Sequence, residues 1–304
     1  MSKEIIIGSR GSDLALWQAN FVQAELKKFG YASTIKIIKT QGDLIQNLSF
    51  DKLEGKGFFT KEIEEQLLNS DIDVAVHSHK DLETNPPAGL TIAAVSHRED
   101  PRDLLLINKD ALDDNENLCL KQNTVIGTSS ARRKNLIQKL RSDITLKDLR
   151  GNVPTRIEKL KTDGYDAIIL AAAGVNRLEL DLSDIAVVEL DPTIYVPAPA
   201  QCVLGLQIRE GDEFMTEALS HLNNEEVAER IFVERKVLNL FEGGCQLPLG
   251  VYCEKEEDTF KVWASMSEKW EETPVTGYYE SKNNKELPEL IVADLKKKSQ
   301  IASL

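Results

Sequence analysis

The sequence predicts an α/β protein with two doubly wound domains around a cleft and a smaller α+β domain at its C-terminal end. Through the first two-thirds of the chain, short apolar runs rich in β-branched residues alternate with helical patterns, as is typical of doubly wound folds with parallel strands. A charged segment at 96–103 and a proline-rich segment at 191–201 interrupt the alternation, and the pattern changes from about residue 222. We therefore predict three domains, with bounds 1–99 plus 197–220, 100–196 and 221–304.

The elements of domain 1 follow from the spacing of its apolar residues. The run EIIIGS at 4–9 predicts a strand, and the spacing of three and four residues between Leu14, Trp17, Phe21 and Ala24 predicts an amphipathic helix after it. The elements that follow are a strand at 34–40, a helix at 60–69 and a strand at 71–78.

Domain 2 repeats this rhythm, and domain 3 departs from it. In domain 2 we expect strands at 124–129, 144–150 and 165–172, with helices at 130–141 and 154–164. In domain 3 we expect a helix at 225–241, a glycine-rich loop around Cys245 and a strand at 258–267.

Composition limits the partners and the compartment. The 304 residues carry a formal net charge of −13, which argues against a general binder of nucleic acid or anionic membranes. The apolar run near the N-terminus is too short for a signal peptide, and no later run is long enough to span a bilayer. The four cysteines form no CxxC pair, which favours reduced thiols. We expect a soluble, monomeric, cytoplasmic protein.

Arginines indicate an anion-binding site. The chain has only twelve, yet Arg132, Arg133, Arg150, Arg156 and Arg177 all fall within 46 residues. Several lie where a predicted strand ends or a predicted helix begins, which is where α/β proteins bind ligands and where helix N-termini favour anions. Arginine adds a bidentate fork that suits carboxylate or phosphate. The alternative is that they are surface arginines paired with the many acids, but the whole set favours a polyanionic ligand.

The segment VAVHSHKDL at 74–82 is the second candidate site. It places Ser78, Lys80 and Asp81 at the carboxyl end of an apolar strand. Strand alternation puts His77 and His79 on one face, with Asp81 on the same side if the strand continues. Such a set could hold a metal, but no second ligand cluster accompanies it, so we expect none. Asp81 is a candidate acid–base or cation-stabilising group, and the alternative is a helix N-cap.

Two loops and a lone cysteine complete the candidates. In LEGKGFFTKE at 53–62, Lys56 lies between glycines, as in a mobile loop, and the P-loop spacing is absent. In GSRGSDLAL at 8–16, Arg10 and Ser12 lie at a strand-to-helix turn that suits an anion. Cys245 lies in FEGGCQLPLG at 241–250. From this segment alone, a cysteine that packs in the core and a reactive or derivatised thiolate are equally open interpretations.

Taken together, these segments resemble the hydroxymethylbilane synthase (porphobilinogen deaminase) family. The motifs that carry the resemblance occur in the family's order: SRGSDLAL, EGKGFFTKE, DVAVHSHKD, REDPRD, GTSSARR, LRGNVPTR, YDAIILAAAGVNRL and EGGCQLPLG. The resemblance implies three domains, of which the first two are similar to type II periplasmic binding proteins. It also implies a transferase of tetrapyrrole biosynthesis that needs no metal.

The resemblance further implies a covalent cofactor and a reaction. Cys245 would bear a dipyrromethane through a thioether bond. Four porphobilinogen molecules would be joined to this primer with loss of ammonia, and hydroxymethylbilane would be released by hydrolysis. Because each ring carries an acetate and a propionate, the product accumulates carboxylates.

The motifs assign roles residue by residue. Asp81 matches the catalytic aspartate and also a cofactor contact. Lys80 matches a catalytic and cofactor-contacting lysine, and Lys56 a catalytic residue on the loop that covers the cleft. The other matched cofactor contacts are Ser78, Thr128, Ser129, Arg132, Arg133 and Asn152. The matched substrate contacts are Arg10, Ser12, Arg150, Arg156, Arg177 and Gln201.

One segment departs from the family pattern. VPAPAQCVLGLQIR at 196–209 replaces a commoner Val-Gly-Gln-Gly pattern: Gln201 remains, while Pro199 and Cys202 stiffen and crowd it. Two alternatives to the enzyme are a non-catalytic binding protein with the same two-domain cleft and a paralogue inactivated through this segment. Asp81 and the cysteine-bearing third domain count against the first.

Overall fold

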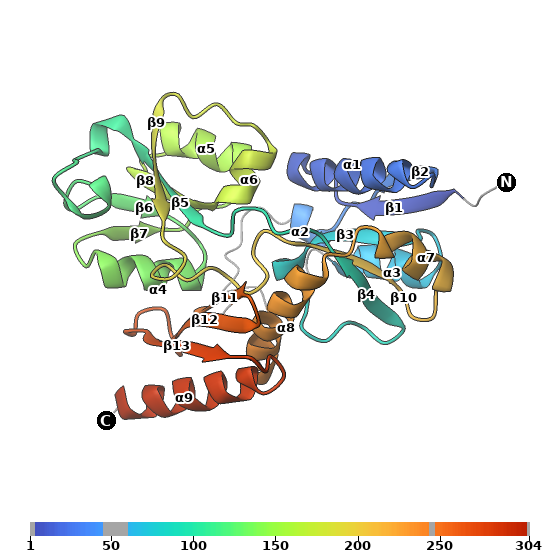
Figure 1. Cartoon of the computed structure of the whole chain (residues 1–304). Coiled ribbons are helices and arrows are strands. Elements are labelled where there is room, and N and C mark those ends of the chain that lie inside the picture. The colour runs from blue at the N-terminus through green and yellow to red at the C-terminus, as the bar shows by residue number, and fades with distance from the viewer. Residues whose placement is uncertain (1–3, 45–59, 243–246, 303–304) are drawn as a thin grey trace. The chain divides into compact units, whose positions relative to one another are not determined.

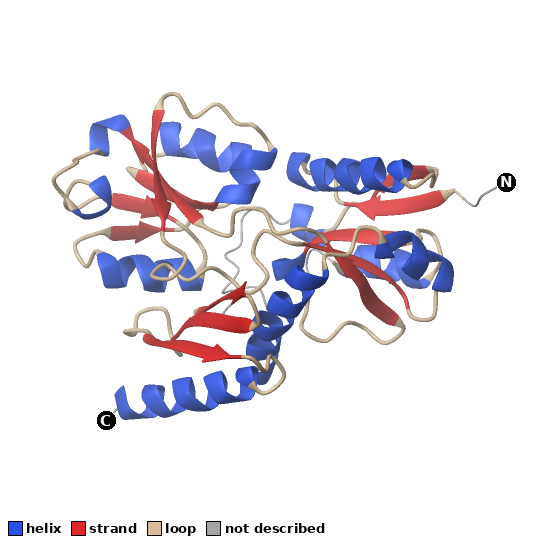
Figure 2. Ribbon diagram, viewed as in Figure 1, coloured by secondary structure: helices blue, strands red, loops and turns tan. Residues whose placement is uncertain are grey.

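The computed structural model describes residues 4–44, 60–242 and 247–302 (Figures 1 and 2). Lys56 and Cys245 lie outside the described residues. The chain forms two compact units, the first from residues before 100 together with 201–229 and the second from 100–200 together with 230–304. The predicted division into three domains stays a prediction.

The first unit is built on a five-stranded sheet with the order β2-β1-β3-β10-β4. Strand β1 (Ile5–Ser9) pairs in parallel with β2 (Ser33–Ile37) and β3 (Val74–Ser78). Strand β10 (Leu204–Arg209) is antiparallel to both β3 and β4 (Leu90–Val95). The sheet is therefore mixed, and the expectation of parallel strands is wrong for it. The strand that returns to this unit after residue 200 inserts in the opposite direction.

Helices α1 (Asp13–Lys28), α3 (Lys61–Leu68) and α7 (Glu213–Ser220) pack on this sheet, and a short helix, α2, spans Gln41–Leu44. Helix α1 begins at Ser12, whose hydroxyl accepts a hydrogen bond from the Ala15 amide, because such a cap satisfies an amide that the helix itself leaves unbonded. Its Ala19, Val22 and Leu26 are fully buried against the apolar residues of β1, β3 and β10. The periodicity of the sequence thus predicted this helix correctly.

The second unit contains another five-stranded sheet, with the order β7-β6-β8-β5-β9. Strand β6 (Val125–Gly127) is parallel to β7 (Thr145–Lys147) and β8 (Ala167–Ala171). Strand β5 (Asp103–Asn108) is antiparallel to β8 and to β9 (Ile185–Leu190), so this sheet is mixed too. Its helices are α4 (Ala131–Leu140), α5 (Val153–Thr162) and α6 (Ala172–Arg177). Alternate residues of β5 and β8 feed two separate apolar clusters, as a sheet covered on both faces requires.

The C-terminal part of the second unit is a three-stranded antiparallel sheet with the order β11-β12-β13. Its strands are β11 (Leu249–Glu256), β12 (Thr259–Met266) and β13 (Val275–Ser281), and α8 (Glu225–Leu240) and α9 (Leu287–Ala302) supply the helical side of its core. The predicted fold class, two α/β sheets with an α+β C-terminal part, is confirmed. None of the helices in the described residues is both long and apolar enough to cross a bilayer.

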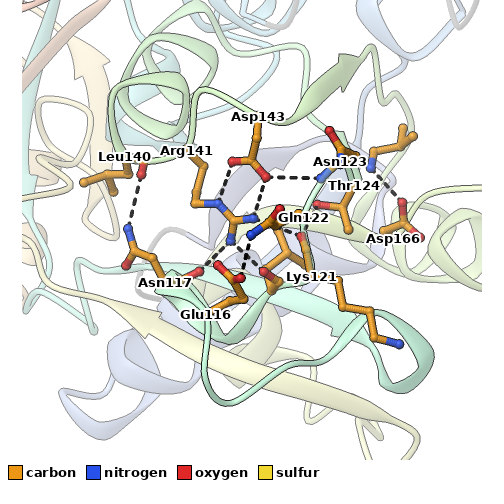
Figure 3. A network of polar contacts seen from close by, with 12 residues as sticks. Glu116, Asn117, Lys121, Gln122, Asn123, Thr124, Leu140, Arg141, Asp143 and Asp166 are labelled. Carbon is orange, nitrogen blue, oxygen red and sulfur yellow. Dashed lines mark hydrogen bonds and ion pairs between the residues drawn. The ribbon is translucent and has the colours of Figure 1, made fainter.

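Hydrogen bonds from one arginine, Arg141, hold the loop before β6 in place (Figure 3). All five N–H groups of Arg141 are used: its Nε and one terminal nitrogen bind Asp143, and three other hydrogen bonds of 2.6–2.9 Å go to the carbonyls of Asn117, Leu120 and Lys121. The loop holds three non-glycine residues in the left-handed region, at Leu118, Cys119 and Asn123. Arg141 lies among the clustered arginines of the sequence, but its hydrogen bonds go to Asp143 and to backbone carbonyls of the neighbouring loop.

We expect Arg141→Lys to lower the free energy of unfolding by about 2–4 kcal/mol, because an ammonium cannot replace a planar five-donor fork and leaves carbonyls unbonded. Urea denaturation measures the loss. Lys161→Met is the control, because Lys161 is 3.9 Å from an Asp184 side chain that is 81% exposed, and such a surface pair contributes roughly 0.5 kcal/mol or less. Equal losses in the two variants would contradict this account of the loop.

Candidate functional site

A cavity of about 100 Å³ lies in the first unit where β3 ends. Strand β3 stops at Ser78, and His79–Asp81 form a single 3₁₀ turn. Because the strand does not continue, the expectation that Asp81 shares a face with both histidines through strand alternation is wrong. No helix follows Asp81 in residues 82–89, so the N-cap alternative is wrong too. The cavity is lined by Arg10, Ser12, Leu14, Ala15, Gln18, Thr60, Val76, His77, Ser78 and Asp81.

Helix α1 supplies the opposite wall of this cavity. Ser12, which caps the helix, and Gln18, one and a half turns later, both line it. The Gln18 amide donates a 2.9 Å hydrogen bond to the Ser78 hydroxyl. This bond fixes the end of β3, and thereby the turn that carries Asp81, against the helix.

One buried titratable residue, His77, lines the cavity. His77 is 5% exposed, and burial lowers the pKa of its imidazole to about 4, assisted by the Arg10 charge and opposed by a hydrogen bond with Gln207. The imidazole is therefore neutral at physiological pH. Gln207 also donates a 3.0 Å hydrogen bond to Glu64, and burial raises the pKa of that carboxyl. The formal charges that line the cavity are thus the Arg10 guanidinium and the Asp81 carboxylate.

Lys80 lies beside Asp81 and contacts Gln201. Its ammonium donates a 3.3 Å hydrogen bond to the Gln201 amide oxygen. Lys80 is partly exposed, whereas Gln201 has no exposed surface. The sequence assigned both residues to the site, which stays a prediction, and the structure brings their two side chains together.

In the second unit, the N-terminus of α4 follows β6 as expected. Ser130 caps the helix by accepting from the Arg133 amide, and Thr128 accepts from the Ser130 amide at 3.3 Å. Ser129 is bonded in both directions to the backbone of Leu149. The hydroxyls of Thr128, Ser129 and Ser130 are therefore used to stabilise the conformation of this turn.

Arg132 and Arg133 share one carboxylate that the sequence analysis missed. Asp103, at the start of β5, is 0% exposed; it forms an ion pair with Arg132 at 2.8 Å and accepts a 2.7 Å hydrogen bond from Arg133. Arg132 also donates to the Val196 carbonyl, and Arg133 to the Ile169 carbonyl. With two guanidiniums and one carboxylate, the cluster keeps a formal charge of +1. The signal for Asp103 was present in the motif REDPRD, but the sequence analysis used these charges only to place a boundary between domains.

The remaining arginines of this unit lie near the N-terminus of α5 and in α6. Asn152 caps α5 by accepting from the Thr155 amide at 2.9 Å, and Arg156 bonds the Gly151 carbonyl at 2.8 Å. Gly151 has φ +119°, and a Cβ there would lie 2.7 Å from the Thr155 side chain, so only glycine fits. Arg150 and Arg156 are partly exposed, whereas Arg177, in the last turn of α6, is 7% exposed.

Comparison with known proteins decides the family. A family model described as "Porphobilinogen deaminase, dipyromethane cofactor binding domain" matches residues 5–217. The chain belongs to the porphobilinogen deaminase family. The porphobilinogen deaminase of Helicobacter hepaticus is 45% identical over 255 residues, which are 83% of this chain and 77% of that protein. The one of Fusobacterium nucleatum is 43% identical over 87% of this chain and 88% of its own length. Among solved structures, the methionine-binding protein MetQ is 14% identical, covers 74% of this chain and 92% of its own, and has a TM-score of 0.45.

Membership in the porphobilinogen deaminase family confirms the resemblance that the motifs predicted. The chain is a transferase of tetrapyrrole biosynthesis, and its family implies porphobilinogen as substrate and a dipyrromethane cofactor. The matched residues include both sets of polar groups described above but end before Cys245. The residue roles therefore stay predictions.

We expect Asp103→Asn to lower the free energy of unfolding by about 3–5 kcal/mol, because it leaves two buried guanidiniums without their counter-charge. Urea denaturation measures the change. Asp184→Asn, at a carboxylate that is 81% exposed, is the matched control and should change stability by roughly 0.5 kcal/mol or less. A loss below about 1 kcal/mol for Asp103→Asn would show that neither arginine depends on the shared carboxylate.

We also expect His77 to make folding sensitive to acid. Its pKa falls from the usual 6.5 to about 4 on folding, so the unfolded chain binds the proton first. The stabilisation is complete above the unfolded pKa and is lost as the pH falls toward the folded one. Between pH 7 and pH 5 the free energy of unfolding should fall by about 2 kcal/mol through this one residue. Urea denaturation at a series of pH values should show a shallower fall for His77→Gln than for the wild type, and parallel curves would refute this role.

Proposed function

We propose that this chain joins four porphobilinogen molecules head to tail onto a dipyrromethane primer, held by a thioether bond to Cys245, and then releases hydroxymethylbilane by hydrolysis. It does so in the cytoplasm, as a monomer. The observation that carries the proposal is the cavity at the end of β3, where the Asp81 carboxylate, the Arg10 guanidinium and the Ser78 hydroxyl meet beside a neutral imidazole.

The groups of each unit suit a dipyrromethane. Such a molecule carries carboxylate side chains and pyrrole N–H donors, so it needs cations and hydroxyls for the former and an acceptor for the latter. The first unit offers Arg10, Ser12, Ser78 and Lys80 together with the Asp81 carboxylate. In the second unit, the cluster of Arg132, Arg133 and Asp103 keeps a positive charge. When bound, the cofactor supplies the unsubstituted pyrrole α-carbon to which a porphobilinogen is joined.

Asp81 carries the chemical step. As porphobilinogen loses ammonia, its C–N bond breaks, the electron pair leaves with nitrogen, and positive charge develops on the pyrrole. A carboxylate that accepts the pyrrole N–H at that moment stabilises this charge more than it stabilises the neutral substrate, and so lowers the barrier. When the new C–C bond forms, one proton would leave the attacking α-carbon, and the released ammonia would take it up as ammonium. Asp81 is exposed at the edge of its turn, within reach of a substrate.

The cations bind the carboxylates that accumulate. Arg150 and Arg156 are partly exposed and are assigned to the lengthening product. Arg133 is assigned to a cofactor contact made by a side chain that is held in place, because its terminal nitrogens already bond Ile169 and Asp103. The other proposed contacts are Arg10, Ser12, Arg132, Arg177, Thr128, Ser129 and Asn152, with Lys56 covering the bound chain.

Intact mass and turnover test the proposal together. The protein purified from a host that makes the cofactor should be heavier than its sequence by two linked pyrrole units. Asp81→Asn should keep this added mass but lose at least about 10²-fold in kcat for porphobilinogen, because it removes the charge that stabilises the cation. Asp71→Asn, at an exposed aspartate before the same strand, is the control and should turn over normally.

An unmodified mass would refute the covalent primer and favour a binding protein or an inactive paralogue. Normal turnover by Asp81→Asn would remove this carboxylate from the mechanism.

A further inference from the structure

The side chain of Asn135 joins helix α4 to the C-terminal part of the second unit. It is 2% exposed, and its amide nitrogen donates hydrogen bonds to the carbonyls of Trp270 at 3.0 Å and of Glu272 at 2.6 Å. Both carbonyls belong to the loop 267–274, which connects β12 to β13. The amide oxygen of Asn135 is buried as well and bonds no described residue. The two donated hydrogen bonds are therefore the polar contacts by which this side chain holds the loop.

The loop 267–274 presents these carbonyls from a closed turn. The Glu272 amide donates to the Lys269 carbonyl at 3.2 Å, and the Lys269 amide donates to the Glu272 carboxylate at 3.4 Å. Trp270 lies between them, and the Lys134 ammonium of α4 is 5.3 Å from the centre of its indole ring, a cation–π distance. The turn thus meets α4 through an aromatic ring as well as through its backbone.

A second attachment begins at Arg132, one turn earlier on the same helix. Arg132 donates a 2.9 Å hydrogen bond to the Val196 carbonyl, and the next carbonyl, of Pro197, accepts the Val251 amide of β11 at 3.0 Å. A Cβ at Gly250 would lie 2.5 Å from the Val196 carbonyl oxygen, so a residue without a side chain is needed for β11 to come this close. The segment 196–197 is therefore bonded both to the start of α4 and to the strand that follows Cys245 in the sequence.

We propose that Asn135 is a positioning residue for Arg132, because its two hydrogen bonds fix the start of α4 on the C-terminal part. This inference rests on the proposed function, in which Arg132 binds the cofactor that Cys245 carries. The elements that flank Cys245 in the sequence, α8 and β11, belong to the same C-terminal part. With α4 fixed there, a guanidinium for the cofactor's carboxylates keeps one place relative to the elements on either side of the cofactor's attachment point.

Hydrogen exchange of the whole chain tests the attachment without depending on turnover. In Asn135→Leu, which replaces the amide by an apolar group of the same branching, the amides of residues 268–273 should exchange several-fold faster than in the wild type. The amides of β12 should exchange as before, and mass spectrometry of peptic fragments reads both. The matched control is Asn108→Leu. Asn108 also donates to two carbonyls of the second unit, Leu160 at 2.9 Å and Tyr165 at 2.7 Å, and its loss should leave exchange in 268–273 unchanged.

Kinetics separate positioning from a purely structural role. Because Arg132 is assigned to the cofactor and not to the incoming porphobilinogen, Asn135→Leu should lower kcat about tenfold while KM changes by less than about twofold. Asn108→Leu should keep both values. If the leucine variant does not fold, Asn135→Ala, which adds no bulk, takes its place with the same expected exchange and kinetics.

Two results would overturn the proposal. Wild-type exchange in residues 268–273 of the Asn135 variant would show that this side chain does not hold the loop. Faster exchange with a wild-type kcat would show that the attachment does not position Arg132. A wild-type protein without the added pyrrole mass would instead refute the proposed function, while the exchange would still decide whether Asn135 makes the attachment.

Discussion

The buried carboxylate of Asp103 is the constraint on which the second unit's candidate site depends. A guanidinium taken out of water needs hydrogen bonds and a counter-charge, and Asp103 gives one oxygen to Arg132 and the other to Arg133. The same contacts join β5 to α4, because Asp103 opens the strand and both arginines lie in the first turn of the helix. Since one carboxylate serves two cations, the positive charge of the cluster is reduced and not abolished. A chain with a net charge of −13 can in this way hold two guanidiniums side by side around a single carboxylate.

Both units hold cations with carboxylates, and each also uses neutral acceptors. In the second unit the acceptors are a carboxylate and main-chain carbonyls, such as Val196 for Arg132 and Gly151 for Arg156. In the first unit the Lys80 ammonium contacts a neutral amide. The acceptor matters because a carboxylate lowers the net charge that a ligand meets, whereas an amide or carbonyl only directs it. Arg141 differs from these cations, because all of its N–H donors bond Asp143 and the neighbouring loop, so none is left for a ligand. An arginine-rich stretch therefore contains structural and binding arginines that spacing alone does not separate.

The sequence predicted the class of the fold and the end of β3 better than the direction of the strands and the partners of the buried polar groups. Helix α1 was predictable because Leu14, Trp17 and Phe21 repeat at helical spacing, and Ser78, Lys80 and Asp81 were placed correctly at the end of a strand. Strand direction was not predictable, because the buried runs of β5 and β10 read alike whichever way they pair. The 3₁₀ turn at His79–Asp81 broke the alternation that the sequence suggested. Asp103 and Gln207 were missed because a buried polar residue is recognised by its partners, which only the fold brings together.

The turn at 200–202 shows how a local departure from the family pattern fits an otherwise consistent structure. The sequence resemblance leads one to expect glycines on either side of Gln201, and at those two positions this chain has Ala200 and Cys202 with φ of +60° and +71°. A non-glycine residue held there costs about 1–2 kcal/mol. In return, the unfolded chain has fewer conformations to lose than it would with two glycines. Ala200 and Cys202 are also buried, and their side chains add apolar contacts that glycine lacks. The two side chains therefore restrict the backbone on either side of Gln201 more than glycines would.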